Sequence, residues 1–262
     1  MEFIYSSENN FIKKIKRLKL KKWRDIDRLF IAEGIKFLDF DILPNAVILL
    51  ENVSFSEKYN YKLNNLQCKK ITVPIKIFSQ LTTQKNSQGI LFVYNYINEK
   101  LSDYSDNIVI LDKISDPGNL GTIIRLIDAV GYKDIILTNN CVDIFNEKVV
   151  RSSMGSILNI NYTIMNPEKI LELLKNNYYK ILATNINKNS VSYEKMQLET
   201  KNAFIFGNEG DGVSDIFLEN CDENIIIPIY GMAESLNVSV ACGIILYKSK
   251  ELQFKNNKGG SN

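Results

Sequence analysis

Residues 108–125 read IVILDKISDPGNLGTIIR, and this stretch decides which class of fold the chain adopts. Four apolar residues lead into a turn around Pro117, and apolar residues at helical spacing follow the turn. A short, continuously apolar strand that is followed by a helix is typical of a buried parallel sheet. The stretch therefore predicts an α/β domain, with Asn119 as the N-cap of a helix that begins at Leu120.

The same alternation of strand and helix continues through the C-terminal half of the chain. Further strands are expected at residues 135–137, 181–183, 203–206 and 225–227, and further helices around Val149 and from Leu236. Such alternation indicates a single parallel-sheet domain.

The N-terminal half carries separate short apolar runs, which predict a smaller α/β domain. These runs lie at residues 29–34, 46–50, 71–74 and 89–94. We expect an N-terminal domain at residues 1–97, a polar linker at 98–106, a C-terminal domain at 107–254 and a disordered polar tail at 255–262.

The composition excludes several classes of protein. The chain of 262 residues is 45% hydrophobic and contains no histidine, which removes the usual general base and the Ser-His-Asp and Cys-His mechanisms. Its four cysteines are scattered, so neither a disulfide framework nor a metal site is expected. No apolar run approaches the roughly 20 residues that cross a bilayer, and the first residues do not begin a signal peptide. We expect a cytoplasmic protein that contacts no membrane.

Positive charge is concentrated at the N-terminus. Residues 1–24 contain eight Lys and Arg residues against two Glu residues, a net charge of +6 in a chain whose total is +2. A basic cluster of this kind suits a phosphate backbone, although a solvated helix face is an equally good interpretation. The residues that we predict to contact such a nucleic-acid backbone are Lys13, Lys14, Lys16, Arg17, Lys21, Lys22 and Arg24.

Three polar segments stand where predicted strands end or helices begin, which is where ligands bind in an open α/β sheet. They are NLGTIIR at residues 119–125, FGNEG at 206–210 and SLNVSVA at 235–241. Taken singly, they fit a capped surface helix, a tight glycine turn and a buried helix. The glycines of the second segment come late in the domain, whereas a dinucleotide-binding glycine motif follows the first strand. A nicotinamide-dependent oxidoreductase is therefore excluded.

In this order, the three segments resemble the SpoU (TrmH) family of RNA ribose 2′-O-methyltransferases. The resemblance covers residues 108–247 and implies S-adenosylmethionine as cofactor, a trefoil knot, and a homodimer in which each site borrows an arginine from its partner. It implies catalytic or substrate-positioning roles for Asn119, Arg125, Glu209, Ser235 and Asn237, and a cofactor pocket that includes Gly207, Ile227 and Leu236. Residues 21–24, 30–34 and 87–90 are similar to the ribosomal-protein-like RNA-binding domain that precedes the catalytic domain in many members.

The resemblance implies methyl transfer to a ribose 2′-hydroxyl of RNA. The N-terminal domain favours ribosomal RNA of the 23S type as substrate, and transfer RNA or a non-catalytic role in RNA binding or ribosome assembly are the alternatives. A guanidinium, with a pKa above about 12, is a poor base. We therefore expect Arg125 to hold the target phosphate and stabilise the developing alkoxide, with Glu209 and Asn119 fixing Arg125.

Overall fold

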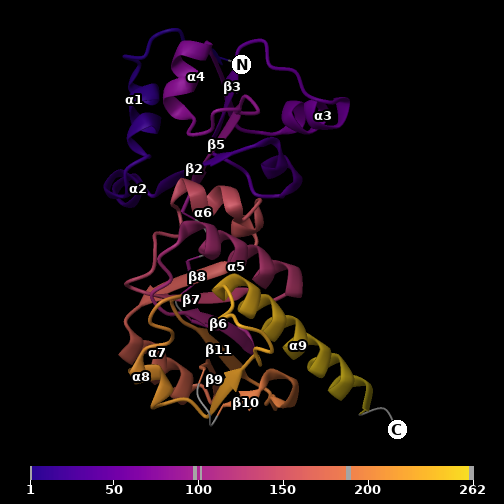
Figure 1. Ribbon diagram of the computed structural model, residues 1–262. Coiled ribbons are helices and arrows are strands. Elements are labelled where there is room, and N and C mark those ends of the chain that lie inside the picture. Colours follow the sequence, from indigo (N-terminus) through magenta and orange to yellow (C-terminus); the bar gives the residue numbers. More distant parts are fainter. Residues whose placement is uncertain (1, 97–98, 101, 187–189, 260–262) are drawn as a thin grey trace. The chain divides into compact units, whose positions relative to one another are not determined.

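The computed structural model describes residues 2–96, 99–100, 102–186 and 190–259 (Figure 1). The chain divides into two compact units. The first consists of Met1–Ile97 together with Asp143–Leu158, and the second of Asn98–Val142 together with Asn159–Asn262. Segment 143–158, which the sequence suggested would lie in the C-terminal domain, is thus part of the N-terminal unit.

The first unit is built on a five-stranded mixed sheet in the order β1-β4-β3-β5-β2. Strands β1, β4 and β3 pair in parallel, while β5 pairs antiparallel with both β3 and β2. Its elements are β1 (Glu2–Phe3), α1 (Asn10–Arg17), α2 (Lys21–Asp27), β2 (Leu29–Glu33), a 3-10 helix (Ile35–Asp39), β3 (Ala46–Leu50), α3 (Glu57–Asn65), β4 (Lys69–Val73), α4 (Ile75–Leu81), β5 (Ile90–Asn95), α6 (Glu147–Ser152) and a second 3-10 helix (Ser156–Leu158). Ile12 and Ile15 of α1 are buried in the core of this unit, so one face of the helix packs against the sheet.

Aromatic and charged contacts tie segment 143–158 into the first unit. The ring of Phe145 stacks on Phe30 and on Tyr96, with ring centroids 4.6 and 4.1 Å apart. Asp143 forms an ion pair with Arg24, in which the two side chains are only 10% and 6% exposed. Sequence patterns do not reveal these contacts, because the ion pair joins residues 119 positions apart.

The second unit is an all-parallel, seven-stranded sheet in the order β10-β12-β9-β11-β6-β7-β8, which confirms the predicted class of fold. Its elements are β6 (Asn107–Leu111), α5 (Pro117–Val130), β7 (Asp134–Thr138), β8 (Asn161–Met165), α7 (Pro167–Asn176), β9 (Lys180–Thr184), β10 (Val191–Ser192), a 3-10 helix (Tyr193–Lys195), β11 (Asn202–Phe206), α8 (Asp215–Leu218), β12 (Glu223–Ile226) and α9 (Val238–Gly259).

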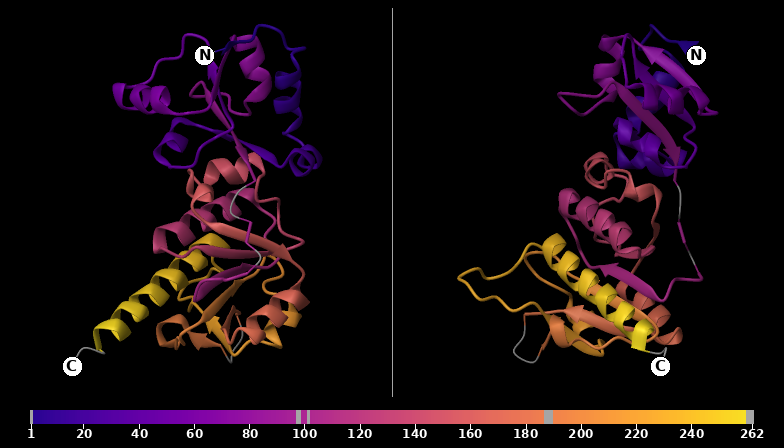
Figure 2. Two further views of the ribbon diagram at one scale, coloured as in Figure 1. Left: turned by 180° about the vertical axis from the view of Figure 1, so that it is seen from behind. Right: turned by 90° about the vertical axis from the view of Figure 1, so that its right-hand side faces the viewer.

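Helices cover both faces of this sheet, which explains why its central strands are apolar throughout (Figures 1 and 2). Helices α7 and α8 pack on the face to which Ile108, Ile110 and Ile205 point. Helices α5 and α9 lie together on the other face, where Tyr132 stacks on Phe204 and its hydroxyl meets that of Ser249 at 2.7 Å.

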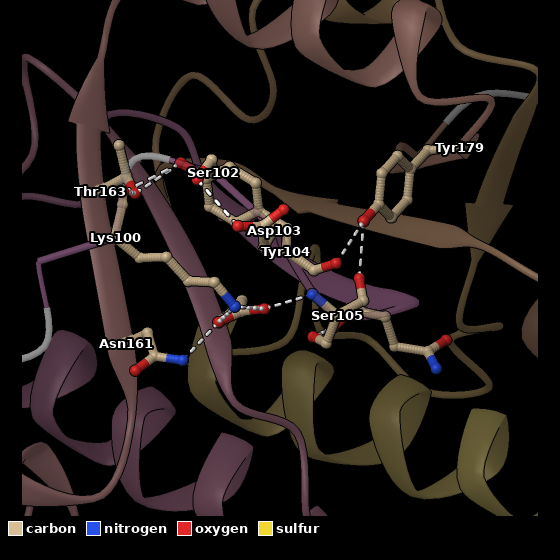
Figure 3. Close-up of polar contacts among 10 residues, drawn as sticks. Lys100, Ser102, Asp103, Tyr104, Ser105, Asn161, Thr163 and Tyr179 are labelled. Carbon is tan, nitrogen blue, oxygen red and sulfur yellow. Dashed lines mark hydrogen bonds and ion pairs between the residues drawn. The ribbon is translucent and has the colours of Figure 1, made fainter.

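Part of the stretch that was expected to be a linker is fixed to the sheet (Figure 3). The buried carboxylate of Asp134, at the start of β7, accepts hydrogen bonds from Lys100 Nζ at 3.1 Å, from the Ser105 amide at 2.5 Å and from Asn161 Nδ2 at 2.7 Å. The hydroxyl of Tyr179 donates to the Ser105 carbonyl at 2.7 Å. Burial by itself would raise the pKa of Asp134, but these hydrogen bonds outweigh it and lower the pKa below its usual value. Residues 98 and 101 of the expected linker lie outside the described residues.

Two local predictions differ from the structure. Helix α5 begins at Pro117 with Asp116 as its N-cap, so Asn119 lies inside the first turn and donates its backbone amide to Asp116 Oδ1 at 2.8 Å. Proline at the first helical position fits this start, because its missing N–H has no partner there in any case. Helix α9 continues through Gly259, whereas disorder was expected from Lys255; residues 260–262 lie outside the described residues. Among the described residues, no helix is both long and apolar enough to cross a membrane.

Candidate active site

A pocket of about 480 Å³ opens in the second unit at the carboxyl ends of β9, β11 and β12. This is the edge of a parallel sheet at which ligands bind, and the volume lies within the range of about 300–1,000 Å³ that is usual for small-molecule sites. Gly207, Ile227 and Leu236, the three residues predicted to hold the cofactor, all line it.

Gly207 permits a close approach of backbone to backbone at the edge of the pocket. A Cβ atom at this position would lie 2.1 Å from the carbonyl carbon of Gly212, so no larger residue fits without moving the loop. Asn208 and Gly212 exchange two backbone hydrogen bonds of 3.1 and 3.0 Å, which close residues 208–212 into a narrow turn. Gly212 adopts a φ of +68°, a conformation that favours glycine. The glycine-rich segment therefore forms a rigid turn with Glu209 near its tip.

Hydrogen bonds connect three of the predicted catalytic residues, although they come from distant parts of the sequence. The side-chain amide of Asn119 donates to the Glu209 carboxylate, and Asn119 Oδ1 accepts a hydrogen bond of 3.0 Å from Asn237 Nδ2. Asn237 Oδ1 in turn accepts from the Ser239 amide at 2.9 Å and from its hydroxyl at 2.6 Å, so Asn237 caps α9. The side-chain amide of Asn119 is thus oriented from both sides.

Arg125 and Ser235 lie outside this hydrogen-bonded network. Arg125 is exposed on α5, and within the described residues it makes neither a hydrogen bond nor an ion pair. Within one copy of the chain, Glu209 and Asn119 bind each other, so the expectation that they fix Arg125 stays a prediction. Ser235 is exposed and lines the pocket.

The basic segment of the first unit differs from the expectation at Arg24, while its other arginine, Arg17, is partly exposed and paired with a carboxylate. Arg24 is buried, and its guanidinium donates to the carbonyls of Leu18 and Lys19 as well as to Asp143, so it cannot contribute an exposed contact to RNA. Arg17 forms a bidentate pair with Asp27 and lies 4.4 Å from the centre of the Trp23 ring.

The lysines of this segment remain on the surface, but several are paired with carboxylates. Lys13 pairs with Glu8 at 2.6 Å and holds the pKa of that carboxyl below its usual value. Lys14 lies 3.7 Å from Asp27, and Lys21 pairs with Asp25 at 2.7 Å. Lys16 and Lys22 are exposed and, in the part of the chain that the structure describes, take part in no ion pair.

Comparison with known proteins gives the same assignment as the geometry of the pocket. Residues 106–247 match the SpoU rRNA Methylase family, and residues 9–91 match the MRM3-like substrate binding domain. The chain belongs to the SpoU rRNA methylase family. It is thus an RNA 2′-O-methyltransferase that uses S-adenosylmethionine, as the sequence predicts.

Similar proteins match over nearly the whole chain. The 23S rRNA (guanosine(2553)-2′-O)-methyltransferase RlmP of Bacillus subtilis (strain 168) is 33% identical over 94% of this chain and 98% of its own length. An AdoMet-bound rRNA methyltransferase from Sinorhizobium meliloti superposes with a TM-score of 0.83 at 28% identity, over 96% of this chain and 98% of that protein. An RNA 2′-O ribose methyltransferase superposes with a TM-score of 0.82 at 25% identity, over 96% and 99% of the two chains. The trefoil knot that the family resemblance implies stays a prediction.

The pocket has the chemistry that S-adenosylmethionine requires. Its apolar wall includes Ile227 and Leu236, next to the backbone of Gly207, and such a wall suits the adenine base. Glu209, Asp211, Asp215 and Glu234 also line it. Carboxylates suit a cofactor that carries a positive sulfonium and a positive ammonium group.

Sequence reasoning overlooked two residues that hold the glycine-rich turn. Asn208 Nδ2 donates to the Lys113 carbonyl at 2.9 Å and lies 3.3 Å from Ser115 Oγ, while its Oδ1 accepts from the Gly210 amide at 2.7 Å. Asp112 accepts from the Ser214 amide at 2.8 Å. For Asp112, the sequence does contain an indication, because this carboxylate directly follows the continuously apolar strand 108–111.

Proposed function

We propose that this enzyme methylates a ribose 2′-hydroxyl of ribosomal RNA of the large-subunit type, in the cytoplasm, and that the pocket beside Gly207 is its cofactor site. The observation that carries the proposal is the hydrogen-bonded network of Asn119, Glu209 and Asn237, which meets the rim of that pocket at Glu209. The full-length match to a relative named as a 23S rRNA methyltransferase supports ribosomal rather than transfer RNA.

The bound cofactor supplies an electrophilic methyl group on a positively charged sulfur. The protein has to align the ribose oxygen with that methyl carbon and stabilise the negative charge that develops on the oxygen. Asn119 and Asn237 fix the position of the Glu209 carboxylate at the rim, and Ser235 lies on the same rim, where its hydroxyl can position the ribose.

In this proposal, the positively charged side chain of the site is Arg125 from a second copy of the chain. Val240, Tyr247 and Phe254 follow one another every seven residues on α9, so they form one stripe, and their exposed fractions are 50%, 55% and 59%. An exposed apolar stripe on a helix is typical of a subunit interface. Helix α5, which carries Arg125, packs against α9. A dimer formed through α9 would bring Arg125 of one copy to the Glu209 carboxylate of the other, where it holds the target phosphate and stabilises the alkoxide.

Transfer of radiolabelled methyl from S-adenosylmethionine tests the substrate. Total RNA and ribosomal subunits from a strain that lacks the enzyme are incubated with the protein and then separated into ribosomal and transfer RNA. We expect label at a single alkali-resistant linkage of large-subunit rRNA. Label in transfer RNA would contradict the proposed substrate, and cofactor binding without label in any fraction would favour a non-catalytic RNA-binding protein.

Complementation tests whether the arginine acts across the dimer. Arg125→Ala and Glu209→Ala are each expected to lower activity by about 10²–10³-fold, but one of the two sites in a mixed dimer carries both groups. After subunits are mixed and re-equilibrated, activity should recover to about a quarter of the wild-type value, as expected for random assembly of a two-fold dimer. Failure to recover, although mixed dimers are isolated by two different affinity tags, would place Arg125 in its own chain's site.

A further inference from the structure

Asp112 is a fully buried carboxylate that the proposed reaction does not use. Its residue is 0% exposed, and both hydrogen bonds to its Oδ2 atom come from Ser214, one from the backbone amide at 2.8 Å and one from the hydroxyl. Within the described residues, its Oδ1 atom has no hydrogen-bond partner. A buried carboxylate oxygen without a donor costs free energy, so stability of the unit alone gives no reason for a carboxylate here.

Among the described residues, no Lys or Arg side chain forms an ion pair with Asp112. Ile108 and Ile110, which precede it on the same face of β6, lie in an apolar cluster with Val213 and Phe217. The nearby Cys141 thiol supplies no positive charge to Asp112. Burial raises the pKa of this thiol, and the negative charge of Asp112 raises that pKa further. Ser214 is therefore the group through which Asp112 acts.

Ser214 marks the end of the loop that borders the pocket. This loop, residues 207–214, leaves β11 at Gly207, carries Glu209, and reaches Ser214, the N-cap of α8. It starts beside Asp112, because the Asp112 amide donates to the Phe206 carbonyl at 2.8 Å. Asp112 therefore holds both the beginning and the end of the loop.

Segment 112–115 also holds the middle of the loop and leads directly into α5. The Asn208 side chain bonds to the Lys113 carbonyl at 2.9 Å. Three residues further on, Asp116 caps α5 and accepts the amide of Asn119 at 2.8 Å. Glu209 and Asn119, which bind each other, are thus both attached to the same short segment.

We propose that Asp112 is a positioning residue for methyl transfer, which acts through Ser214 to fix loop 207–214 relative to the first turn of α5. The anchor keeps one wall of the cofactor pocket in place and holds Glu209 within reach of Asn119. This inference rests on the proposed function of the site. The alternative is a purely structural cap of α8, a helix of four residues.

Four variants separate these two roles. Asp112→Ala removes the acceptor, Ser214→Ala removes one donor, and Asp112→Asn keeps an oxygen that both Ser214 donors can reach. Ser249→Ala is the matched control, because it removes another buried serine hydroxyl of the same unit, bonded to Leu246 O at 2.7 Å, and Ser249 itself does not line the pocket. Each is assayed for unfolding in urea, for the Kd of S-adenosylmethionine by calorimetry, and for kcat and KM on RNA.

We expect Asp112→Ala to lower kcat by about 10²-fold, the size of effect that a misplacement of about 1 Å produces, and to weaken cofactor binding about tenfold. The KM for RNA should stay at the wild-type value. Ser214→Ala should show smaller losses of kcat and of cofactor affinity. Asp112→Asn should keep most of the wild-type kcat and most of the cofactor affinity. Ser249→Ala should lose stability but keep its cofactor affinity and kcat.

A double variant decides whether the effect passes through Glu209. In a Glu209→Ala background, Asp112→Ala should lower kcat only slightly further, because the group that it positions is absent. Fully additive losses, or stability losses in Asp112→Ala with unchanged kcat and Kd, would overturn the proposal in favour of a cap. If the wild-type enzyme fails to methylate RNA, the proposed function fails, while the Kd measurements on the same variants still test the anchor separately.

Discussion

The basic N-terminal segment and the carboxyl edge of the parallel sheet both have sequences that suggest function, but their side chains are arranged differently in the structure. In the first region, several charged side chains bind one another: Arg24 pairs with Asp143, Arg17 with Asp27 and Lys13 with Glu8. In the second, polar residues from three distant segments converge beside a pocket. A charge cluster is therefore weaker evidence for a binding site than polar residues at the ends of parallel strands.

Two arginines illustrate the difference. Arg24 stands in the basic cluster and is buried, whereas Arg125 stands in an apolar helix and is exposed. Arg24 has three hydrogen-bond acceptors in its own unit, and Arg125 has none among the described residues. The first is expected to govern stability and the second to govern catalysis.

The largest effect is expected for Arg24→Ala, which should destabilise the protein by about 3–5 kcal/mol because it leaves Asp143 buried without its cation. Urea unfolding measures the loss. The double variant Arg24→Met with Asp143→Leu should regain much of it, since neither partner then remains charged. If the Arg24→Ala protein keeps wild-type stability but binds RNA more weakly, Arg24 contacts RNA and this explanation is wrong.

Arg125→Ala should lower kcat at saturating RNA by about 10²–10³-fold, the usual effect of removing one stabilising group from a transition state. Its free energy of unfolding should change by less than about 0.5 kcal/mol, because the side chain is exposed. Arg125→Lys should recover only part of the activity, since an ammonium lacks the two-pronged guanidinium. Near-normal turnover of the alanine variant would reject the role of Arg125.

Asp134→Asn should destabilise the protein by about 1–3 kcal/mol at neutral pH, because charge-assisted hydrogen bonds to the buried carboxylate are lost. Since folding lowers the pKa of Asp134, its stabilising contribution is present above its ordinary pKa and disappears as the pH falls through the folded-state value. The difference between wild type and variant in urea unfolding should therefore narrow below about pH 4. A difference that stays constant down to pH 3 would contradict this explanation. Cofactor affinity should be unchanged, because Asp134 lies at the opposite end of the strands from the pocket.

The smallest effect is expected at the exposed lysines. Replacing both Lys16 and Lys22 by alanine should weaken RNA binding a few-fold and reduce the slope of log K against log salt by about 1–2. Lys13 and Lys21 form the control pair, because each must leave its carboxylate before it can bind a phosphate. If the two double variants weaken RNA binding equally in a filter-binding assay, ion pairing does not decide which lysines contact RNA. If neither variant weakens binding, the segment is a solvated helix face.

Most strands could be predicted because a continuously apolar run indicates a strand that is buried on both faces of its sheet. Strand β3 has the predicted ends, and β6 and β11 each begin one residue earlier than predicted. Strand β8 (Asn161–Met165) was missed because the polar residues Asn161 and Thr163 interrupt its apolar ones; it is an edge strand of its sheet. The start of α5 was misplaced because both Asp116 and Asn119 can cap a helix, and only the observed backbone shows which one does.

The sequence by itself determined the parallel sheet, the glycine-rich turn and the family of the enzyme, because each depends on residues that are neighbours in the chain. Only the tertiary structure decided that segment 143–158 belongs to the N-terminal unit, that Arg24 is buried, and that Asp112 anchors the loop of Glu209. The reason is physical: burial and backbone conformation follow local patterns, whereas an ion pair or anchor between residues about a hundred positions apart arises only when folding brings them together.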